Sequence, residues 1–391
     1  MVGKLALVVV GKASTQVRRW STTVLIATAA MFAASCAPES PQPRVAANAE
    51  ATTAYPMPKV GVDGTSLTLD GRKWWPIGIN AYQLGTNWDI NAGCGAQVDL
   101  DQYFGSLAPH SLTRINIYSS FAVNKRTGQL DLSSLDAIFE AALRHNQLLI
   151  AVLSGGEGGC ENGWFKDYDW YAGGWKHEVP HELPMPFADW LELAVNRWGN
   201  SPALAGWTAV GEPEPSKCTD SECTWAARFC PADSAAVLRS FFDEVGAKIR
   251  TLDPDALLFS GHTGGGQCGS VGEDYEMVAA SPGIDVVEYH YYQATDYLPG
   301  DARDGLQRRI EQAHELNKPL MVAEVGVEAG APCKSLTQRE QEISLIVGAQ
   351  RAHGAAGVMF WSYVPDPRLS ECTLDIGPND PLFRMIGAAG A

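Results

Sequence analysis

The chain has 391 residues, which is enough for one large barrel or for two ordinary domains. Asp and Glu outnumber Lys and Arg by 45 to 29, so the formal net charge is −16, and no basic tract or stripe is present. We therefore expect no nucleic-acid partner, because phosphate binding needs clustered Lys and Arg. The twelve Trp and twelve Tyr suit flat, neutral ligands such as sugars, although many of them will belong to the core.

Residues 1–36 have the features of an export signal, with four basic residues before an uncharged, largely apolar segment at 20–35. This segment is shorter than the roughly 18–20 apolar residues that a membrane-spanning helix needs. It ends in Ala33-Ala-Ser-Cys36, which resembles a bacterial lipobox with Ala33 in place of the usual Leu. Cys36 would then be lipidated and form the only membrane contact; the alternative is a plain signal peptide cut nearby. Residues 37–58 lack periodicity and predict a disordered linker.

From Val60 the pattern becomes regular. Residues 60–73 alternate apolar and polar side chains around Asp-Gly pairs, which predicts a β-hairpin that could plug the bottom of a barrel. Eight apolar segments that predict strands follow: Trp75–Asn80, Leu112–Tyr118, Leu148–Leu153, Gly206–Gly211, Ala256–Ser260, Ile284–His290, Leu320–Glu324 and Val358–Trp361. The clearest predicted helices lie between them: Ser133–His145, Pro186–Trp198, Ala232–Leu252, Ala302–Leu316 and Gln338–His353.

This alternation of strands and helices predicts that residues 59–391 form an α/β domain, a (β/α)8 TIM barrel. A doubly wound open sheet is the alternative fold. It would carry a Gly-rich phosphate-binding loop after its first strand, and residues 78–82 contain none. The barrel is therefore the prediction, and its functional residues should lie on the loops that follow the strands.

Eight cysteines remain beside Cys36, an even number that predicts disulfides in an exported chain. All eight follow a predicted strand, so we expect the disulfides to brace loops on the C-terminal face. Eight cysteines allow 105 connectivities, and only Cys333–Cys372 is favoured, because these two follow neighbouring strands of a closed barrel. A zinc site at Cys218, Cys223 and Cys230 is the alternative, although the usual C-x-x-C spacing is missing.

Two buried strands each end at a glutamate. Glu212 follows the apolar run that ends at Gly211, and Glu324 ends the run 320–324. A carboxylate in such a place costs free energy unless it is paired, neutralised or used. Two of them suggest an acid and a nucleophile that act as a pair. The alternative is that each is a strand-end residue in a salt bridge.

Other polar and aromatic residues stand at strand ends in the same order as in a known family. They are Asn80, Arg114, Trp207 and Pro213 around Glu212, His290, Tyr292, and Trp361 after Phe360. Together with the two glutamates, this pattern over roughly residues 60–365 resembles the retaining glycoside hydrolases of clan A, and most closely family 5.

The resemblance implies a role for each of these positions. Glu212 would be the general acid/base and Glu324 the nucleophile, which would form a covalent glycosyl-enzyme. The remaining site residues would bind or orient: Arg114 would keep the nucleophile ionised, Tyr292 would hydrogen-bond it, His290 would lie beside the acid/base, Trp361 would stack under the sugar, and Asn80 would contribute to substrate binding. The resemblance implies neither a metal nor another cofactor.

The chain departs from the family at Gly211, where Asn normally precedes the acid/base and contacts the sugar 2-hydroxyl. Another group replaces this Asn, or the substrate presents the hydroxyl differently, or the protein is slow or inactive. Three further carboxylates are rivals for the catalytic roles: Glu157, Glu214 and Glu288. We expect Glu214 to point to solvent and Glu288 to be a partner of Arg114 inside the barrel.

The loop from Gly155 to Pro186 is rich in aromatic residues. Trp170 and Trp175 are predicted to stack on sugar rings, and the alternative is that the aromatic side chains pack the loop on itself. The sequence as a whole predicts an exported, monomeric, retaining β-glycosidase that acts on a polysaccharide of the β-mannan or β-glucan type. Two alternatives stay open: an enzyme that remodels envelope glycans of unusual sugar composition, and a glycan-binding lipoprotein with weak turnover.

Overall fold

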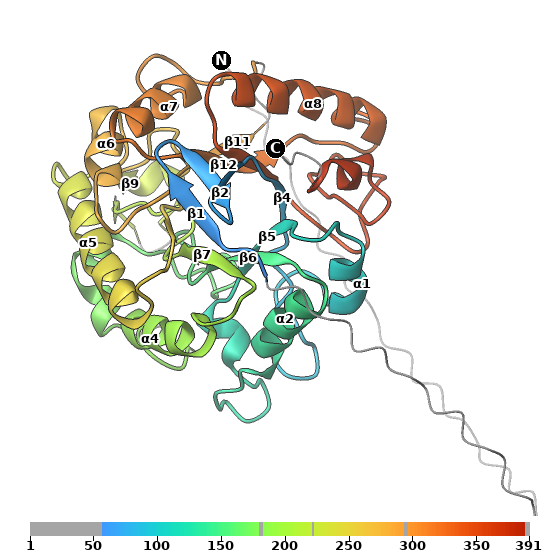
Figure 1. The fold of residues 1–391 in the computed structure, drawn as a ribbon. Coiled ribbons are helices and arrows are strands. Elements are labelled where there is room, and N and C mark those ends of the chain that lie inside the picture. Colours follow the sequence, from blue (N-terminus) through green and yellow to red (C-terminus); the bar gives the residue numbers. More distant parts are fainter. Residues whose placement is uncertain (1–56, 180–182, 221–222, 293–295, 388–391) are drawn as a thin grey trace, which may run out of the picture. The chain divides into compact units, whose positions relative to one another are not determined.

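Eight parallel strands form the centre of the fold, and Figure 1 looks along the ring that they make. They are β4 (Ile77–Asn80), β5 (Leu112–Asn116), β6 (Leu148–Val152), β7 (Leu204–Thr208), β10 (Leu258–Phe259), β11 (Val287–Tyr292), β12 (Leu320–Gly326) and β13 (Gly357–Phe360). A parallel bridge between Phe259 and Val286 closes the ring between β10 and β11. The predicted (β/α)8 barrel is confirmed, and each strand overlaps its predicted segment.

The structure is a computed structural model that describes residues 57–179, 183–220, 223–292 and 296–387. All of these belong to one unit, Tyr55–Ala391. The predicted leader at 1–36 and nearly all of the predicted linker at 37–58 lie outside the described residues. No helix in the described part of the chain has the length and apolarity needed to cross a bilayer.

Helices surround the barrel in the order that the apolar periodicity predicts (Figure 1). The longer ones are α2 (Ser133–Arg144), α4 (Phe187–Trp198), α5 (Ser234–Leu252), α7 (Leu306–Glu315) and α8 (Leu336–Ala352), and the shorter ones are α1 (Leu100–Gly105), α3 (Tyr168–Ala172) and α6 (Glu273–Ala279). In α5, Leu238, Phe241, Val245 and Ile249 are buried at intervals of three and four residues, so one face of this helix packs against the core. Four short 3-10 helices complete the helical elements of the described residues: η1 (Ser119–Ala122), η2 (Gly174–Lys176), η3 (Trp225–Ala227) and η4 (Pro381–Met385).

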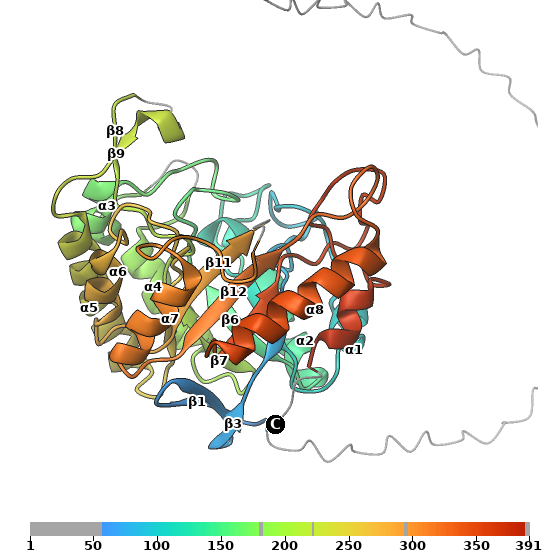
Figure 2. The ribbon, with the colours of Figure 1, turned by 90° about the horizontal axis from the view of Figure 1, so that it is seen from above.

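A small antiparallel sheet covers the end of the barrel where the strands begin (Figure 2). It comprises β1 (Val60–Asp63), β2 (Ser66–Leu69) and β3 (Arg72–Trp74), so the predicted hairpin is confirmed and gains a third strand. Val60 and Leu67 are buried in one cluster with Leu112 and Met321 from the barrel strands. This sheet therefore closes the bottom of the barrel, and the loops of the opposite end are left to form a site.

Four disulfides brace the loops at the carboxyl ends of the strands, as predicted. They are Cys94–Cys160, Cys218–Cys223, Cys230–Cys268 and Cys333–Cys372. The favoured pair Cys333–Cys372 is confirmed, and the zinc alternative is wrong because its three cysteines are all oxidised. Cys218–Cys223 lies in the loop that carries the short strands β8 (Lys217–Cys218) and β9 (Arg228–Phe229). Disulfides of this number are typical of a protein that folds in an oxidising compartment.

Candidate active site

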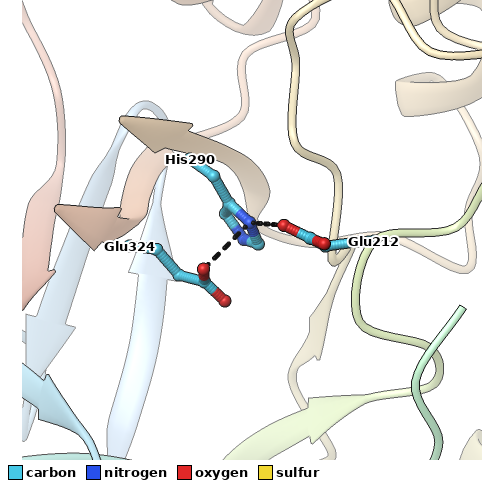
Figure 3. Close-up of side chains that lie close together, drawn as sticks. All are labelled: Glu212, His290 and Glu324. Carbon is cyan, nitrogen blue, oxygen red and sulfur yellow. Dashed lines mark hydrogen bonds and ion pairs between the residues drawn. The ribbon is translucent and has the colours of Figure 1, made fainter. Parts of the chain in front are cut away.

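Glu212 and Glu324 meet in one cleft at the carboxyl end of the barrel. Glu324 lies within β12 and is buried, and Glu212 lies in the loop that follows β7. Both line a cleft of about 1010 Å³. A carboxylate oxygen of each and a ring nitrogen of His290 all lie within 4.8 Å of one another (Figure 3). The structure therefore brings together the two carboxylates that the strand ends predict.

The backbone of Glu212 is held by the loops on either side of it. The Glu212 N–H donates to the carbonyl oxygen of Gly261 at 2.9 Å, and the Gly211 N–H donates to that of Ser154 at 2.9 Å. Glu212 has a φ of 56°, in the left-handed region that residues other than glycine rarely adopt. A Cβ atom at Gly156 would collide with the carbonyl oxygen of Glu212. The turn thus needs glycine beside it, and it projects the Glu212 side chain into the cleft.

Glu324 is surrounded by donors. Arg114 Nη1 donates to Glu324 Oε1 at 2.8 Å, the Tyr292 hydroxyl donates to Oε2, and His290 Nδ1 lies 3.3 Å from Oε2. Arg114 and Glu324 are both buried, so this ion pair is screened little by solvent. These donors favour the charged form of Glu324, which a nucleophile requires, and oppose the effect of its burial.

Asn80 lies behind this ion pair and not in the cleft. Its Oδ1 accepts a hydrogen bond from Arg114 Nη1 at 3.1 Å, and its Nδ2 donates to the carbonyl oxygens of Ala323 and Phe360. The Asn80 side chain is 1% exposed. The prediction that Asn80 binds substrate is therefore corrected: its side chain is engaged by Arg114 and by two backbone carbonyl groups, and it orients Arg114.

His290 connects the two carboxylates. Its Nδ1 lies 2.7 Å from Glu212 Oε1 and 3.3 Å from Glu324 Oε2 (Figure 3). Burial lowers the pKa of His290, but the two negative charges outweigh burial and leave that pKa above its usual value. Burial raises the pKa of Glu212, but the hydrogen bond and charge of His290 outweigh it, so that pKa lies below its usual value. Burial raises the pKa of Glu324, and the charges of His290 and Arg114 offset this only in part.

Trp361 follows β13 directly and lines the cleft. Its indole is stacked on the ring of Tyr82, with centroids 5.7 Å apart and planes at 11°. Tyr82 also lines the cleft and was not among the predicted residues. Its position two residues after Asn80, directly beyond the first barrel strand, was the signal that would have found it. The pair forms an aromatic wall beside Glu324 on which a sugar ring can stack.

Trp170 and Trp175 lie elsewhere, and the prediction that they stack on substrate is corrected. They are 1% and 4% exposed. Both pack their rings against Phe241 of α5, at centroid distances of 5.6 and 5.7 Å, and both also contact Phe187 of α4. The alternative that these aromatic residues pack the loop is the one that the structure shows, because α4 and α5 supply the apolar partners.

The three other candidate carboxylates, Glu157, Glu214 and Glu288, each have a partner other than Glu212 or Glu324. Glu157 and Glu214 both pair with Arg228, at 2.6 and 3.1 Å. Glu214 is buried, so the expectation that it points to solvent is wrong: Arg228 offsets the cost of burying its charge. Glu288 is fully buried and accepts a hydrogen bond from the Gly261 N–H. Its charge acts on Arg114, but among the described residues no hydrogen bond joins the two side chains.

Glu212, His290 and Glu324 could also offer three ligand atoms to a metal ion. However, Glu324 already binds the guanidinium of Arg114 at 2.8 Å. A second cation would be placed close to this charge and repelled by it. The donor set therefore suits proton transfer and nucleophilic attack better than metal binding.

The Gly211 backbone lies close against Arg114. An ideal Cβ at this position would lie 3.3 Å from Arg114 Nη2 and 3.4 Å from Val152 Cγ1. Nη1 binds both Asn80 and Glu324, whereas no hydrogen bond joins Nη2 to another residue that the structure describes. Since Gly211 and Arg114 both line the cleft, this free N–H lies beside the space that an asparagine side chain would fill.

Comparison with known proteins finds relatives that are named as mannan-hydrolysing enzymes. The chain is 24% identical over 339 residues to a probable mannan endo-1,4-beta-mannosidase F of Aspergillus flavus, covering 77% of this chain and 66% of that protein. It is 26% identical over 269 residues to a probable mannan endo-1,4-beta-mannosidase C of Aspergillus terreus, covering 60% of this chain and 64% of that protein. The resemblance to glycoside hydrolase family 5 of clan A is confirmed. The matched region is slightly less than two thirds of either relative, and no family model matches the chain.

Solved structures share the fold. An endo-1,4-beta-mannanase from Rhizomucor miehei superposes with a TM-score of 0.60 at 19% identity, covering 83% of this chain and 96% of that one. A glycoside hydrolase family 5 mannosidase from the same organism gives a TM-score of 0.54 at 15% identity, covering 85% and 96%. The sequence and fold comparisons together support the predicted glycoside hydrolase.

Proposed function

We propose that the protein is an exported, retaining β-glycosidase that hydrolyses a polysaccharide by double displacement, with Glu212 as acid/base and Glu324 as nucleophile. The separation of the two carboxylates carries the proposal. One oxygen of each lies within 4.8 Å of the other. So close an approach of two carboxylates favours the retaining geometry, in which the carboxyl groups are about 5–5.5 Å apart, over the inverting one, in which they are about 6.5–9.5 Å apart.

In the first step, Glu324 attacks the anomeric carbon while Glu212 protonates the leaving oxygen, and a glycosyl ester of Glu324 forms. The Arg114 guanidinium and the Tyr292 hydroxyl orient the attacking carboxylate. In the second step, Glu212 takes a proton from water, the hydroxide oxygen attacks the anomeric carbon, and Glu324 leaves as a carboxylate. The stereochemistry at the anomeric carbon is retained because it is inverted twice.

His290 supplies the proton that the first step needs. Its raised pKa favours the protonated ring in the free site, with Nδ1 at 2.7 Å from Glu212 Oε1. The Glu212 side chain is 37% exposed in the free cleft. A bound sugar removes water from this carboxylate and raises its pKa, so the proton passes along the hydrogen bond to Glu212.

The cleft favours a neutral glycan. Seven acidic and two basic side chains line it: Glu157, Glu212, Glu324, Glu328, Asp366, Glu371 and Asp375, and Arg114 and Arg368. An anionic polysaccharide would be repelled by this excess of negative charge. The relatives are named as mannan endo-1,4-beta-mannosidases, which favours β-mannan over β-glucan as the substrate. Export is supported by the four disulfides, and the monomeric state and a lipid anchor at Cys36 belong to the same proposal.

A panel of polysaccharides tests the proposal. We expect release of reducing ends from β-mannan by the wild-type protein and none by Glu324→Ala. A 2-fluoro-glycoside should form a stable adduct with Glu324, which mass spectrometry of the peptides locates. An adduct on another carboxylate would overturn the assignment of the nucleophile.

Gly211 supports a second candidate, a glycan-binding protein with weak turnover, because the usual asparagine is absent. The same panel separates the two. Binding to several glycans without cleavage of any would favour this candidate over the enzyme.

A further inference from the structure

A hairpin projects beyond the face of the barrel that carries the cleft (Figure 2). It consists of β8 and β9 with the turn η3 between them, and it bears Trp225. Trp225 is 65% exposed, the highest value among the large apolar side chains that the structure describes. Most of this indole is therefore open to a ligand that can stack on an aromatic ring.

The indole of Trp225 is held in place from one side. The guanidinium carbon of Arg228 lies 4.4 Å from the centre of the Trp225 ring and 4.0 Å from that of Phe165, so it is sandwiched between them. The Cys218–Cys223 disulfide ties the hairpin to itself, and Cys230–Cys268 ties its end to a neighbouring loop. Trp225 therefore presents its open face on a support that loses little conformational entropy when a ligand binds.

The support is continuous with the cleft. Arg228 Nη1 lies 2.6 Å from Glu157, which lines the cleft, and 3.1 Å from Glu214, two residues beyond the acid/base Glu212. The leaving part of a substrate lies on the side of the acid, because the acid protonates the leaving oxygen. Trp225 thus lies on the leaving-group side of the cleft, and the guanidinium of Arg228 connects it to Glu157 in the cleft wall.

We propose that Trp225 is a distal binding subsite for the leaving-group side of the glycan chain, and that it stacks on a sugar ring of a neutral β-linked polysaccharide. This proposal rests on the proposed function. The indole of Trp225 carries the charged guanidinium of Arg228 on its ring and is otherwise largely exposed. One flat apolar face beside a charged group matches a pyranose ring, whose faces are apolar and whose edges carry hydroxyls. A protein partner would need a larger apolar patch.

The hairpin offers a matched control. Phe229 is also exposed, at 48%, but it is adjacent to Arg228 in β9, so its side chain points to the opposite face of the hairpin. Phe229→Ala removes an exposed aromatic ring from the same element without touching the proposed subsite.

The test compares substrates of different length. For Trp225→Ala we expect KM for soluble β-mannan to rise about three- to tenfold with kcat unchanged, and no change for an aryl glycoside that fills only the centre of the cleft. Trp225→Tyr should restore most of the affinity, and Phe229→Ala should match the wild type. Equal losses on both substrates, or no loss on β-mannan, would overturn the subsite.

A binding measurement keeps this test separate from the proposed function. Titration of soluble β-mannan into Glu324→Ala, with and without Trp225→Ala, needs no turnover. Weaker binding by the double variant supports the subsite even if the wild-type protein cleaves nothing, and unchanged binding contradicts it. Cleavage by the wild type with unchanged binding in the double variant would remove the subsite and leave the proposed function intact.

Discussion

Replacing Gly211 by alanine tests how this site holds a sugar without the usual asparagine. The backbone at Gly211 has no positive φ, so alanine fits its conformation. The added methyl group would lie 3.3 Å from Arg114 Nη2, tighter than an ordinary contact, and would cover the N–H that faces the cleft. We expect this N–H to donate to the sugar 2-hydroxyl in the wild type. The hydroxyl can then donate its own proton to Glu324, since a guanidinium has only donors to offer.

The expected loss of kcat/KM follows from the strength of the hydrogen bond between Arg114 and the sugar 2-hydroxyl. A hydrogen bond to a charged group contributes about 1.5–3 kcal/mol, which corresponds to about ten- to hundredfold in kcat/KM. The assay uses two aryl glycosides that differ only in the 2-hydroxyl. Gly211→Ala should lower kcat/KM for the 2-hydroxy substrate by this factor and leave the 2-deoxy substrate near the wild-type value.

Gly159→Ala is the control, because Gly159 lines the same cleft and its added methyl group would contact nothing within 4 Å. It should leave both substrates unchanged. If Gly211→Ala slows both substrates equally, the methyl group blocks the site in general. If it slows neither, Arg114 Nη2 makes no contact with the sugar. Either result refutes the reasoning.

Three further predictions concern the nucleophile, a buried ion pair and a disulfide. Tyr292→Phe removes a hydrogen-bond donor that lowers the pKa of Glu324. We expect kcat/KM to fall about ten- to hundredfold and the acidic limb of the pH–rate profile to move to higher pH. An acidic limb that does not move would contradict this role of Tyr292. Arg339→Ala leaves the buried Asp380 without its ion-pair partner and should lower the free energy of unfolding in urea by about 3–5 kcal/mol. The exposed Arg384→Ala is the control and should lower it by about 0–1 kcal/mol. Similar losses for the two variants would show that burial is not the cause. Replacing Cys333 and its partner by serine should lower the free energy of unfolding by about 2–4 kcal/mol and lower Tm in calorimetry, and an unchanged Tm would show that the loops are held without it.

The sequence by itself determined the barrel and its pair of carboxylates. Apolar runs and helical periodicity are local properties, so the eight strands and the main helices overlap their predicted ranges. Parallel strands all end on the same face of a barrel, so two glutamates at strand ends must share that face. For this reason Glu212 and Glu324 could be paired although 111 residues, 213–323, lie between them in the sequence. The pairing Cys333–Cys372 followed from the same rule of neighbouring strands.

The tertiary structure decided which of the remaining polar and aromatic side chains reach the cleft. Trp170 is buried because Phe241 arrives from a helix some seventy residues later, and no property of its own loop indicates this contact. Glu214 is buried because Arg228 folds back over it. Burial depends on partners that are distant along the chain, and a pattern of residue types does not carry this information. The ends of the barrel strands therefore determine where the candidate active site lies, while packing between distant segments decides which side chains reach that site.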